Sequence, residues 1–236
     1  MTEPLYHFNS QQREFEATVT HVIGNGVVLD KTAFYPGGGG QPNDIGELEN
    51  GSISWQVTKV GRKENYIIHE LSGIPPAIGT RIRGTIDWVR RYQLMRTHTA
   101  LHMLCGIVWR DYQALVTGGD MQPLQARMDF ELASMTADLA NEMVRKVNKE
   151  ILAKRDVTSS ILPRKEAFAI PDLIRTKINL LPQGIREVRV VNIEGLDLQA
   201  DGGTHVGNTA EVKQIYLIGH ESKGKINKRI RIRLAD

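Results

Sequence analysis

Apolar and polar residues alternate along the first third of the chain with the two-residue period of strands that bury one face. Residues 13–30, REFEATVTHVIGNGVVLD, alternate on either side of a tight GNG turn and predict a β-hairpin. Gly, Pro, Asn and Asp closely separate the following strand-like stretches, SWQVTKVGR, NYIIHEL and GTRIRGTID. Short strands punctuated in this way are typical of a small barrel or sandwich.

The period becomes helical after Asp87, which is a plausible N-cap. An amphipathic helix is predicted over residues 88–112, because apolar residues recur there at mixed i+3 and i+4 spacing: Trp88, Tyr92, Met95, Leu101, Leu104 and Val108. A second helix is predicted from about Thr136 to Arg155, where good helix formers gather. A short helical piece is predicted after Pro171. The remaining β-like stretches are QARMDFEL, REVRVVNI, EVKQIYLIGHES and the basic C-terminal segment.

These elements predict an α+β protein with two parts, because the composition shifts from β-rich to mixed near residue 90. Residues 1–89 are expected to form a small barrel-like β domain that carries a glycine-rich loop. Residues 90–236 are expected to form an α+β domain with helices packed on an antiparallel sheet and with the candidate metal ligands described below. A chain of 236 residues is long enough for one large domain or two small ones.

The composition is ordinary for a soluble globular protein, with 41% hydrophobic and 24% charged residues. No apolar run approaches the roughly 20 residues of a membrane span. The N-terminus lacks a basic segment followed by an apolar stretch, so no signal peptide is predicted. Cys105 is the single cysteine, which excludes an internal disulfide and fits a reducing compartment. We therefore expect a cytoplasmic protein.

The net charge is only +3, but basic residues gather near the C-terminus in KGKINKRIRIRL. The alternation of charged and apolar residues in RIRIRL predicts a strand with one wet face. This strand could be a solvated edge strand, protected from aggregation by its charges. It could also carry a row of phosphate contacts. The charges alone leave both interpretations open.

His98 and His102 stand four residues apart on the first predicted helix, in RTHTALHML. This spacing projects both imidazoles from one face and lets them reach one metal ion. Two histidines at this spacing can also be satisfied core residues. The residue after His98 is not glutamate, so the HExxH pattern of metalloproteases is absent.

Asp201 and His205, in ADGGTHVGNT, are a second pair four residues apart, on a glycine-bearing loop after a predicted strand. Together with the two helical histidines they would complete a four-ligand set of nitrogen and oxygen donors. Catalytic zinc typically keeps three protein ligands and one open position, so Asp201 could ligate or could orient an imidazole. Alternatively, Asp201 could only cap its own turn by accepting from the N–H of Gly203 or Thr204.

Gly37, Gly38, Gly39 and Gly40 form a continuous run in LDKTAFYPGGGGQPNDIG, with Thr32 before it and Gln41 directly after it. Glycines permit unusual backbone conformations and a close approach of a ligand to the main chain. The flanking side chains could hydrogen-bond a small polar group. The run matches neither a Walker loop nor a dinucleotide-binding fingerprint. The alternative is a flexible hairpin tip.

Taken together, LDKTAFYPGGGGQPNDIG, RTHTALHML, ADGGTHVGNTAEV and KGKINKRIRIRL resemble, in order, the editing domain of alanyl-tRNA synthetase and its free-standing relatives, the AlaX trans-editing proteins. The resemblance extends over nearly the whole chain and is to the medium-length AlaX class. It implies hydrolysis of the ester bond in mischarged tRNA(Ala), chiefly Ser-tRNA(Ala) and also Gly-tRNA(Ala).

The family holds zinc with the two histidines of HxxxH and with a cysteine and a histidine of a CxGTH-like sequence. Carried over, the ligands here are His98, His102 and His205, with Asp201 at the cysteine position. A carboxylate donates less charge than a thiolate, so the ion should be a stronger Lewis acid, bound more weakly and with less selectivity for Zn²⁺ over other divalent ions. Loss of the metal would instead leave a tRNA-binding module without catalysis.

The resemblance also suggests roles for the other motifs. We expect the Thr32 hydroxyl and the main chain of Gly37–Gly40 to recognise the serine hydroxyl, with Gln41 positioning the ester; Thr32 and Gln41 are the candidate catalytic residues. The acceptor stem of tRNA(Ala) is expected to contact four basic residues, Lys225, Lys228, Arg229 and Arg231. A related hydrolase of another small acyl ester is a third interpretation. The preference between serine and glycine, the role of the metal and the oligomeric state stay open.

Overall fold

A computed structural model describes residues 2–178, 181 and 184–236. The chain forms two compact units, Met1–Gln93 and Leu94–Asp236. The long helix α1 (Trp88–Tyr112) begins in the first unit and continues through the second. The predicted domain boundary after residue 89 falls near the start of this helix and stays a prediction.

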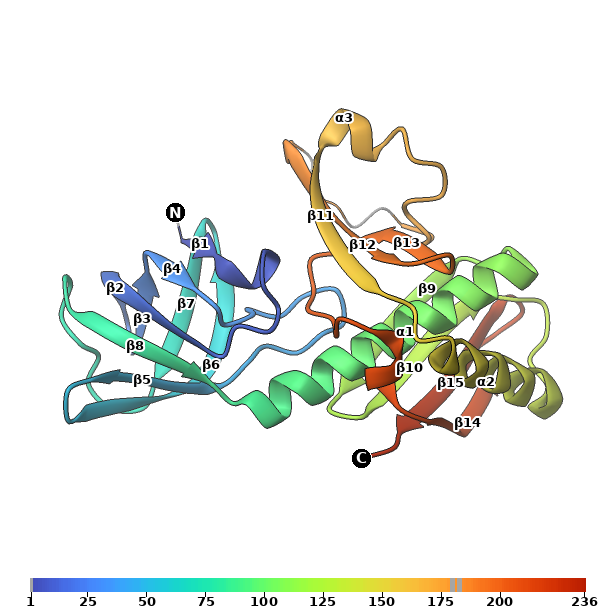
Figure 1. The fold of residues 1–236 in the computed structure, drawn as a ribbon, viewed down its shortest axis with the longest axis horizontal. Coiled ribbons are helices and arrows are strands. Elements are labelled where there is room, and N and C mark those ends of the chain that lie inside the picture. The colour runs from blue at the N-terminus through green and yellow to red at the C-terminus, as the bar shows by residue number, and fades with distance from the viewer. Residues whose placement is uncertain (1, 179–180, 182–183) are drawn as a thin grey trace. The chain divides into compact units, whose positions relative to one another are not determined.

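The first unit is a closed barrel of six antiparallel strands in the order β2-β3-β7-β6-β5-β8 (Figure 1). The strands are β2 (Glu14–Ile23), β3 (Gly26–Leu29), β5 (Gly46–Asn50), β6 (Ile53–Lys63), β7 (Tyr66–Leu71) and β8 (Arg81–Ile86). Two short strands, β1 (Glu3–Pro4) and β4 (Lys31–Thr32), pair in parallel, and a 3-10 turn, η1 (Leu5–His7), follows β1. The alternating apolar side chains point into the barrel and form one buried core, which confirms the predicted barrel.

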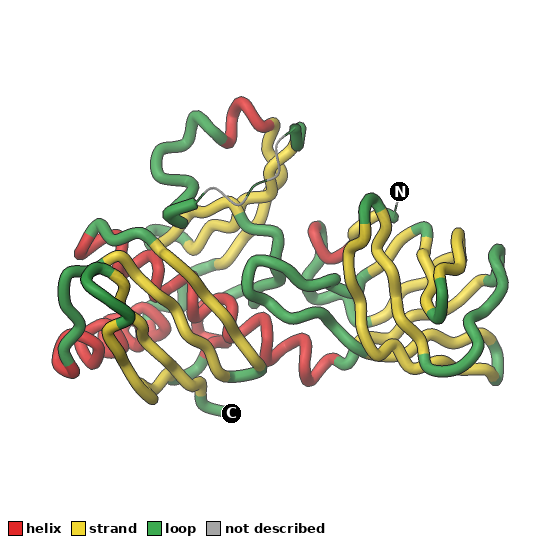
Figure 2. The backbone as a smooth tube through the Cα atoms, turned by 180° about the vertical axis from the view of Figure 1, so that it is seen from behind, coloured by secondary structure: helices red, strands yellow, loops and turns green. Residues whose placement is uncertain are grey.

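The second unit is built around α1 and a four-stranded antiparallel sheet in the order β14-β15-β10-β9. Its elements are β9 (Val116–Gln122), β10 (Gln125–Glu131), β14 (Ile215–Ser222), β15 (Asn227–Leu234), α2 (Ala137–Leu152) and the 3-10 turn η2 (Thr209–Val212). The two long helices cover one face of this sheet (Figures 1 and 2). The predicted α+β fold is therefore confirmed.

A second, three-stranded sheet in the order β11-β12-β13 completes the unit. It consists of β11 (Val157–Pro163), β12 (Glu187–Ile193) and β13 (Asp197–Ala200), and the short helix α3 (Arg164–Ala167) follows β11. This sheet has its own small apolar core, in which Ala167 and Leu173 pack against Val188 and Val190. Its last strand, β13, leads directly into the loop that carries Asp201 and His205.

Several local predictions are confirmed. The hairpin over residues 13–30 forms β2 and β3, and α2 begins where Thr136 accepts a hydrogen bond from the Leu139 N–H at 3.2 Å. Cys105 lies in the core.

The helix predicted after Pro171 does not form in residues 171–178. The main chain there joins β9 instead, because Val116 N–H donates to Arg175 O and Lys177 N–H donates to Val116 O, both at 2.8 Å. A tertiary backbone pairing thus overrides the local preference. The basic strand is also not an edge strand: β15 lies between β14 and β10, although its predicted alternation of buried and wet faces is correct.

The prediction that α1 is amphipathic is wrong for its central part. Every residue from Leu94 to Val108 is buried. The polar side chains of this stretch face other protein groups rather than water, so α1 is the central helix of its unit.

Among the described residues, no helix has the length and apolar character needed to cross a membrane.

Candidate metal centre

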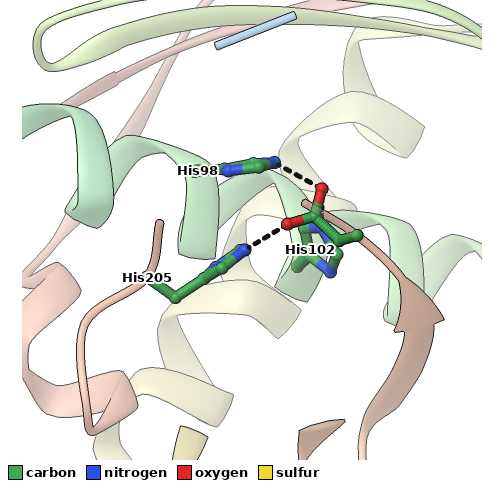
Figure 3. Close-up of side chains that lie close together, drawn as sticks. His98, His102 and His205 are labelled. Atoms are coloured by element: carbon green, nitrogen blue, oxygen red, sulfur yellow. Dashed lines mark hydrogen bonds and ion pairs between the residues drawn. The ribbon is translucent and has the colours of Figure 1, made fainter. Parts of the chain in front are cut away.

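Two elements bring the four predicted ligands together. His98 and His102 project from one face of α1, and His205 lies on the loop after β13 (Figure 3). Asp201 lies on the same loop, directly after β13. All three histidines are buried, with 4–7% of their surface exposed. One ligand atom from each of the four residues lies within 4.8 Å of the other three. The sequence separation of about a hundred residues is closed by the packing of β13 against α1.

The Asp201 carboxylate lies among the three imidazoles, and each ring turns its Nε2 toward it. The Nε2–oxygen distances are 3.0 Å from His205, 3.6 Å from His98 and 4.0 Å from His102. Asp201 Oδ2 also accepts the Gly203 N–H at 2.7 Å. Asp201 therefore caps its turn and faces the histidines at the same time, so the two interpretations of this residue are compatible.

The donor set fits a divalent metal ion. Zinc bonds of about 2.0–2.2 Å to nitrogen and oxygen put tetrahedral ligand atoms about 3.3 Å apart, close to the separations between the imidazole nitrogens and Asp201. The rings themselves gather closely, since the His98 and His205 centroids are 4.3 Å apart and those of His102 and His205 are 4.7 Å apart. All four ligand atoms lie within 4.8 Å of one another, so shifts on the order of 1 Å would bring them to the spacing of zinc ligands.

The electrostatics of the cluster favour neutral His98 and His205 beside an ionised Asp201. Burial lowers the pKa of His205 to about 4 and, together with the neighbouring imidazoles, holds the pKa of His98 well below its usual value. Burial opposes ionisation of Asp201, but His98 and His205 hold its pKa well below the usual range. Burial also opposes protonation of His102, yet its hydrogen bond to Asp197 raises its pKa. Neutral imidazole and ionised carboxylate are the forms that ligate metals.

Three supporting residues escaped the sequence analysis. Arg189 on β12 donates to the main-chain oxygens of Asp201 (3.1 Å) and Gly203 (2.9 Å) and so fixes the ligand loop. The hydroxyl of Thr99 lies 3.1 Å from His205 Nδ1. Asp197 Oδ2 lies 3.0 Å from His102 Nδ1. Asp197 and Arg189 alternate with apolar neighbours along their strands, so a local pattern assigns both to a solvent-exposed side.

The glycine run in the first unit has a defined conformation. All four residues from Gly37 to Gly40 have positive φ values, between 59° and 129°, which L-residues with side chains rarely adopt. Gly38 and Gln41 exchange main-chain hydrogen bonds of 3.1 and 3.0 Å. The Tyr35 hydroxyl donates to Gly38 O at 3.0 Å. The run is therefore a closed turn built from internal hydrogen bonds, which a flexible hairpin tip would lack.

A buried ion pair holds the base of this loop. The Arg91 guanidinium donates to both carboxylate oxygens of Asp44, at the end of the loop, and to Ala33 O, at its start. Asp44 in turn accepts the Tyr35 N–H at 2.6 Å. Arg91 and Asp44 are 0% and 1% exposed. The pair therefore ties the two ends of the loop to the first turn of α1.

Thr32 and Gln41 are both buried, with 0% and 2% of their surface exposed. The Thr32 hydroxyl lies 2.8 Å from His69 Nε2 and accepts the Phe34 N–H at 3.1 Å. His69 Nδ1 lies 3.2 Å from Val27 O. A carbonyl only accepts, so Nδ1 carries the proton and Nε2 accepts from the Thr32 hydroxyl. His69, on a barrel strand, is a partner of Thr32 that the sequence analysis missed.

Three of the four basic residues predicted to contact tRNA have partners within the protein. Lys228 is buried, and its ammonium group donates to Gly224 O (2.6 Å) and Lys225 O (3.0 Å). Arg229 makes two hydrogen bonds to the Asp129 carboxylate, and Arg231 bonds Glu221 at 3.1 Å. Lys225 lies in the exposed turn between β14 and β15. The four residues therefore differ in how freely they can meet a phosphate.

Comparison with known families agrees with this architecture. Residues 4–90 match the model of class II (A) tRNA synthetases, and residues 188–231 match the second additional domain of threonyl- and alanyl-tRNA synthetases. These matches place the chain in the class of proteins that share domains with threonyl- and alanyl-tRNA synthetases.

Relatives that match over the full length of the chain identify its family within this class. The chain is 44% identical to the alanyl-tRNA editing protein AlaX-M of Saccharolobus solfataricus over 98% of both chains, and 38% identical to that of Methanosarcina acetivorans over all of both chains. It belongs to the AlaX-M family of alanyl-tRNA editing proteins. It is also 37% identical to the alanine–tRNA ligase of Ignicoccus hospitalis, over 92% of this chain and 24% of the ligase.

Proposed function

We propose that this protein is an editing hydrolase that deacylates mischarged tRNA(Ala), chiefly Ser-tRNA(Ala) and also Gly-tRNA(Ala). The observation that carries the proposal is the buried convergence of His98, His102, His205 and Asp201 in a chain that is similar over its whole length to AlaX-M editing proteins. The reaction adds water across the ester between the amino acid and the tRNA 3′ end. It releases the free amino acid and uncharged tRNA.

We assign the four converging residues as ligands of one divalent ion, Zn²⁺ in the first place. When bound, the ion supplies a Lewis acid that can orient the substrate or increase the acidity of water. The three imidazoles offer their Nε2 atoms. The Gly203 N–H and the Arg189 guanidinium bond Asp201 and hold its carboxylate in place beside them. Because Asp201 offers oxygen where the family has sulfur, Mn²⁺, Co²⁺ or another divalent ion is a reasonable substitute.

The need for a separate editing site follows from chemistry. A pocket built for alanine cannot strongly reject serine, which adds only a hydroxyl, so a second site must recognise that hydroxyl. We assign this recognition to the glycine loop, through Thr32 and the main chain of Gly37–Gly40, with Gln41 positioning the ester. Four successive residues without side chains leave main-chain N–H and C=O groups open to close approach.

For the tRNA we propose contacts between the acceptor stem and the β14–β15 region. Lys225 is the leading candidate, because it is exposed in the turn. Arg229 and Arg231 lie on the open face of the sheet and offer N–H groups beyond those bonded to Asp129 and Glu221. Lys228 would support them through its hydrogen bonds to the turn. Phosphate contacts of this kind set position and affinity, whereas the glycine loop would set selectivity.

The direct test is metal analysis and Ser-tRNA(Ala) deacylation on one preparation. The proposal expects about one divalent ion per chain, loss of turnover on chelation, and recovery with Zn²⁺. Turnover by metal-free protein at the full rate would contradict the role of the metal. A rival function, a tRNA-binding module that has lost catalysis through Asp201, predicts tRNA binding without turnover under any divalent ion. Equal cleavage of Ser-tRNA(Thr) would favour a broader esterase.

Asp201→Cys separates a ligand from a mere turn cap. A thiolate is a stronger zinc ligand than a carboxylate, so the variant should bind Zn²⁺ at least as tightly as the parent protein, whereas Asp201→Ala should bind it more weakly. Competition with a chromophoric chelator measures both. If all three proteins bound Zn²⁺ equally, Asp201 would be a cap alone.

A further inference from the structure

We propose that Asp197 is a positioning residue of the metal centre, which holds His102 in the tautomer that turns Nε2 toward Asp201. Arg175 and Gln199 hold the Asp197 carboxylate in place by donating hydrogen bonds to it. The proposal rests on the proposed metal site but assigns a role to residues outside the ligand set.

The hydrogen bond from His102 fixes the position of the ring proton. His102 Nδ1 lies 3.0 Å from Asp197 Oδ2, and a carboxylate in an ion pair with an arginine only accepts hydrogen bonds. Nδ1 must therefore carry a proton, which leaves Nε2 as the ring nitrogen available for a metal. This Nε2 is the atom that faces the Asp201 carboxylate. A carboxylate behind a metal-binding imidazole fixes its orientation and increases its basicity.

Asp197 is itself held by donors on every side. Its Oδ1 accepts from the Arg175 guanidinium, and its Oδ2 also accepts from Gln199 Nε2 at 2.8 Å. The Asp197 side chain is completely buried. A buried carboxylate is stable only when it is paired and fully hydrogen-bonded, and the Arg175 charge compensates its own. The Arg175 guanidinium also lies 5.7 Å from the ring centre of Trp109, which holds it against α1.

The backbone is shaped to admit this arrangement. Gly106 stands one helical turn after His102 on α1. A Cβ atom there would lie 2.9 Å from Leu196 O, closer than real Cβ contacts allow, and 3.1 Å from Asp197 Cβ, closer than most real Cβ contacts. A glycine is therefore required at this position for the start of β13 to approach α1 closely enough for the Asp197 carboxylate to reach His102.

His205 has a different partner on its far side. Its Nδ1 meets the neutral hydroxyl of Thr99 at 3.1 Å, whereas His102 meets a negative charge. Hydrogen bonds to an ionised acceptor are roughly twice as strong as neutral ones. We therefore expect His102 to be the more strongly positioned ligand of this pair, and Asp197 to contribute measurably to metal affinity.

The test is the Zn²⁺ affinity of Asp197→Asn. In either orientation the amide nitrogen would face a donor, Arg175 on one side or His102 and Gln199 on the other. Both orientations remove the negative charge that supports His102. We expect Zn²⁺ binding to weaken about 10- to 100-fold. Asp129→Asn is the matched control, because Asp129 is also a buried strand aspartate bonded to an arginine, Arg229, but contacts no histidine of the cluster. It should change the affinity less than twofold. An unchanged Zn²⁺ affinity in Asp197→Asn would overturn the proposal.

A second measurement does not depend on the variant folding. Long-range ¹H–¹⁵N spectra of the zinc-loaded parent protein should show His102 protonated on Nδ1 and metal-bound through Nε2. Metal bound through Nδ1 would overturn the proposal. Failure of this inference also differs from failure of the proposed function: in the first case the parent protein binds Zn²⁺ and Asp197→Asn binds it equally well, and in the second the parent protein itself binds none.

Discussion

Thr32 combines a buried hydroxyl with a defined hydrogen-bond direction. Its proton is committed to His69 Nε2, and its oxygen accepts the Phe34 N–H. Towards a substrate the oxygen therefore has only acceptor capacity to offer, and a serine hydroxyl would have to donate to it. Because both Thr32 and His69 have no exposed surface, a substrate reaches this oxygen only where the covering residues move aside.

Thr32→Val should destabilise the protein. The substitution preserves the shape but leaves the buried Nε2 of His69 without a donor, which costs about 1–3 kcal/mol. Urea unfolding of the variant beside Thr32→Ser, which keeps the hydroxyl, measures the cost. The valine variant should also lose discrimination between Ser- and Ala-tRNA(Ala). Equal stability of the two variants would show that the Thr32–His69 hydrogen bond contributes nothing.

The sequence identifies ligand types better than supporting contacts. His98, His102, Asp201 and His205 could be selected because their spacing follows a helix and a glycine turn, and they do converge. Asp197, His69 and Arg189 could not, since their roles depend on which element lies opposite. Asp197 and Gln199 alternate with Leu198 and Ala200 along β13. A local pattern therefore assigns the two polar residues to the solvent-exposed face of the strand. In the structure that face packs on α1.

The barrel strand β7 carries a pH-dependent contribution to stability through His69. Burial lowers the pKa of His69 to about 4 from an ordinary value of 6.5, so the unfolded chain binds a proton more readily than the folded one. The contribution is present above pH 6.5 and is lost as the pH falls through 4. The shift corresponds to about 3 kcal/mol at most.

This contribution can be isolated by comparing the parent protein with His69→Gln in urea unfolding between pH 7.5 and 4.5. Other groups titrate equally in both proteins, so the difference between the two curves reports His69. The parent protein should lose more stability than the variant as the pH falls. Parallel curves would contradict a neutral, buried His69.

The turn between β14 and β15 separates two kinds of lysine. Lys225→Ala should weaken tRNA binding and reduce the slope of log affinity against log salt by about 0.7–0.9, because one phosphate contact is lost. Lys228→Met should mainly lower stability, because the Lys228 ammonium bonds two carbonyls of the turn. Filter binding across salt concentrations and thermal unfolding measure the two effects. A Lys225 variant with an unchanged salt slope would place the tRNA elsewhere.

Elements were predicted well where the periodicity was long and less well where tertiary pairing decided the outcome. The segment after Pro171 bonds to β9 through Arg175 and Lys177 and does not form the predicted helix. Likewise, the alternation in RIRIRL predicted the solvent-exposed face of β15, but it could not predict which strands lie beside β15. The neighbouring strands supply Asp129 and Glu221, which pair with its arginines.

At the scale of the whole molecule, the residues proposed for the reaction belong to two units. The barrel carries the glycine loop, and the second unit carries the histidine cluster around α1. The ordered set of motifs predicted the family, and the division into domains after residue 89 stays a prediction. Zn²⁺ bound by the folded chain and not by the unfolded one should raise stability by about 2.7 kcal/mol at a hundred times Kd. The thermal unfolding temperature should rise accordingly.

The central claim is that three imidazoles and the Asp201 carboxylate hold one divalent ion. Zinc K-edge X-ray absorption on the purified, zinc-loaded protein tests it most directly. The account predicts one zinc per chain, nitrogen and oxygen ligands at about 2.0–2.2 Å, outer-shell scattering from three imidazoles, and no sulfur. Cys105 is buried, and burial raises the pKa of its thiol to about 12, so it offers no thiolate. A sulfur ligand at about 2.3 Å, or fewer than three imidazoles, would contradict the account.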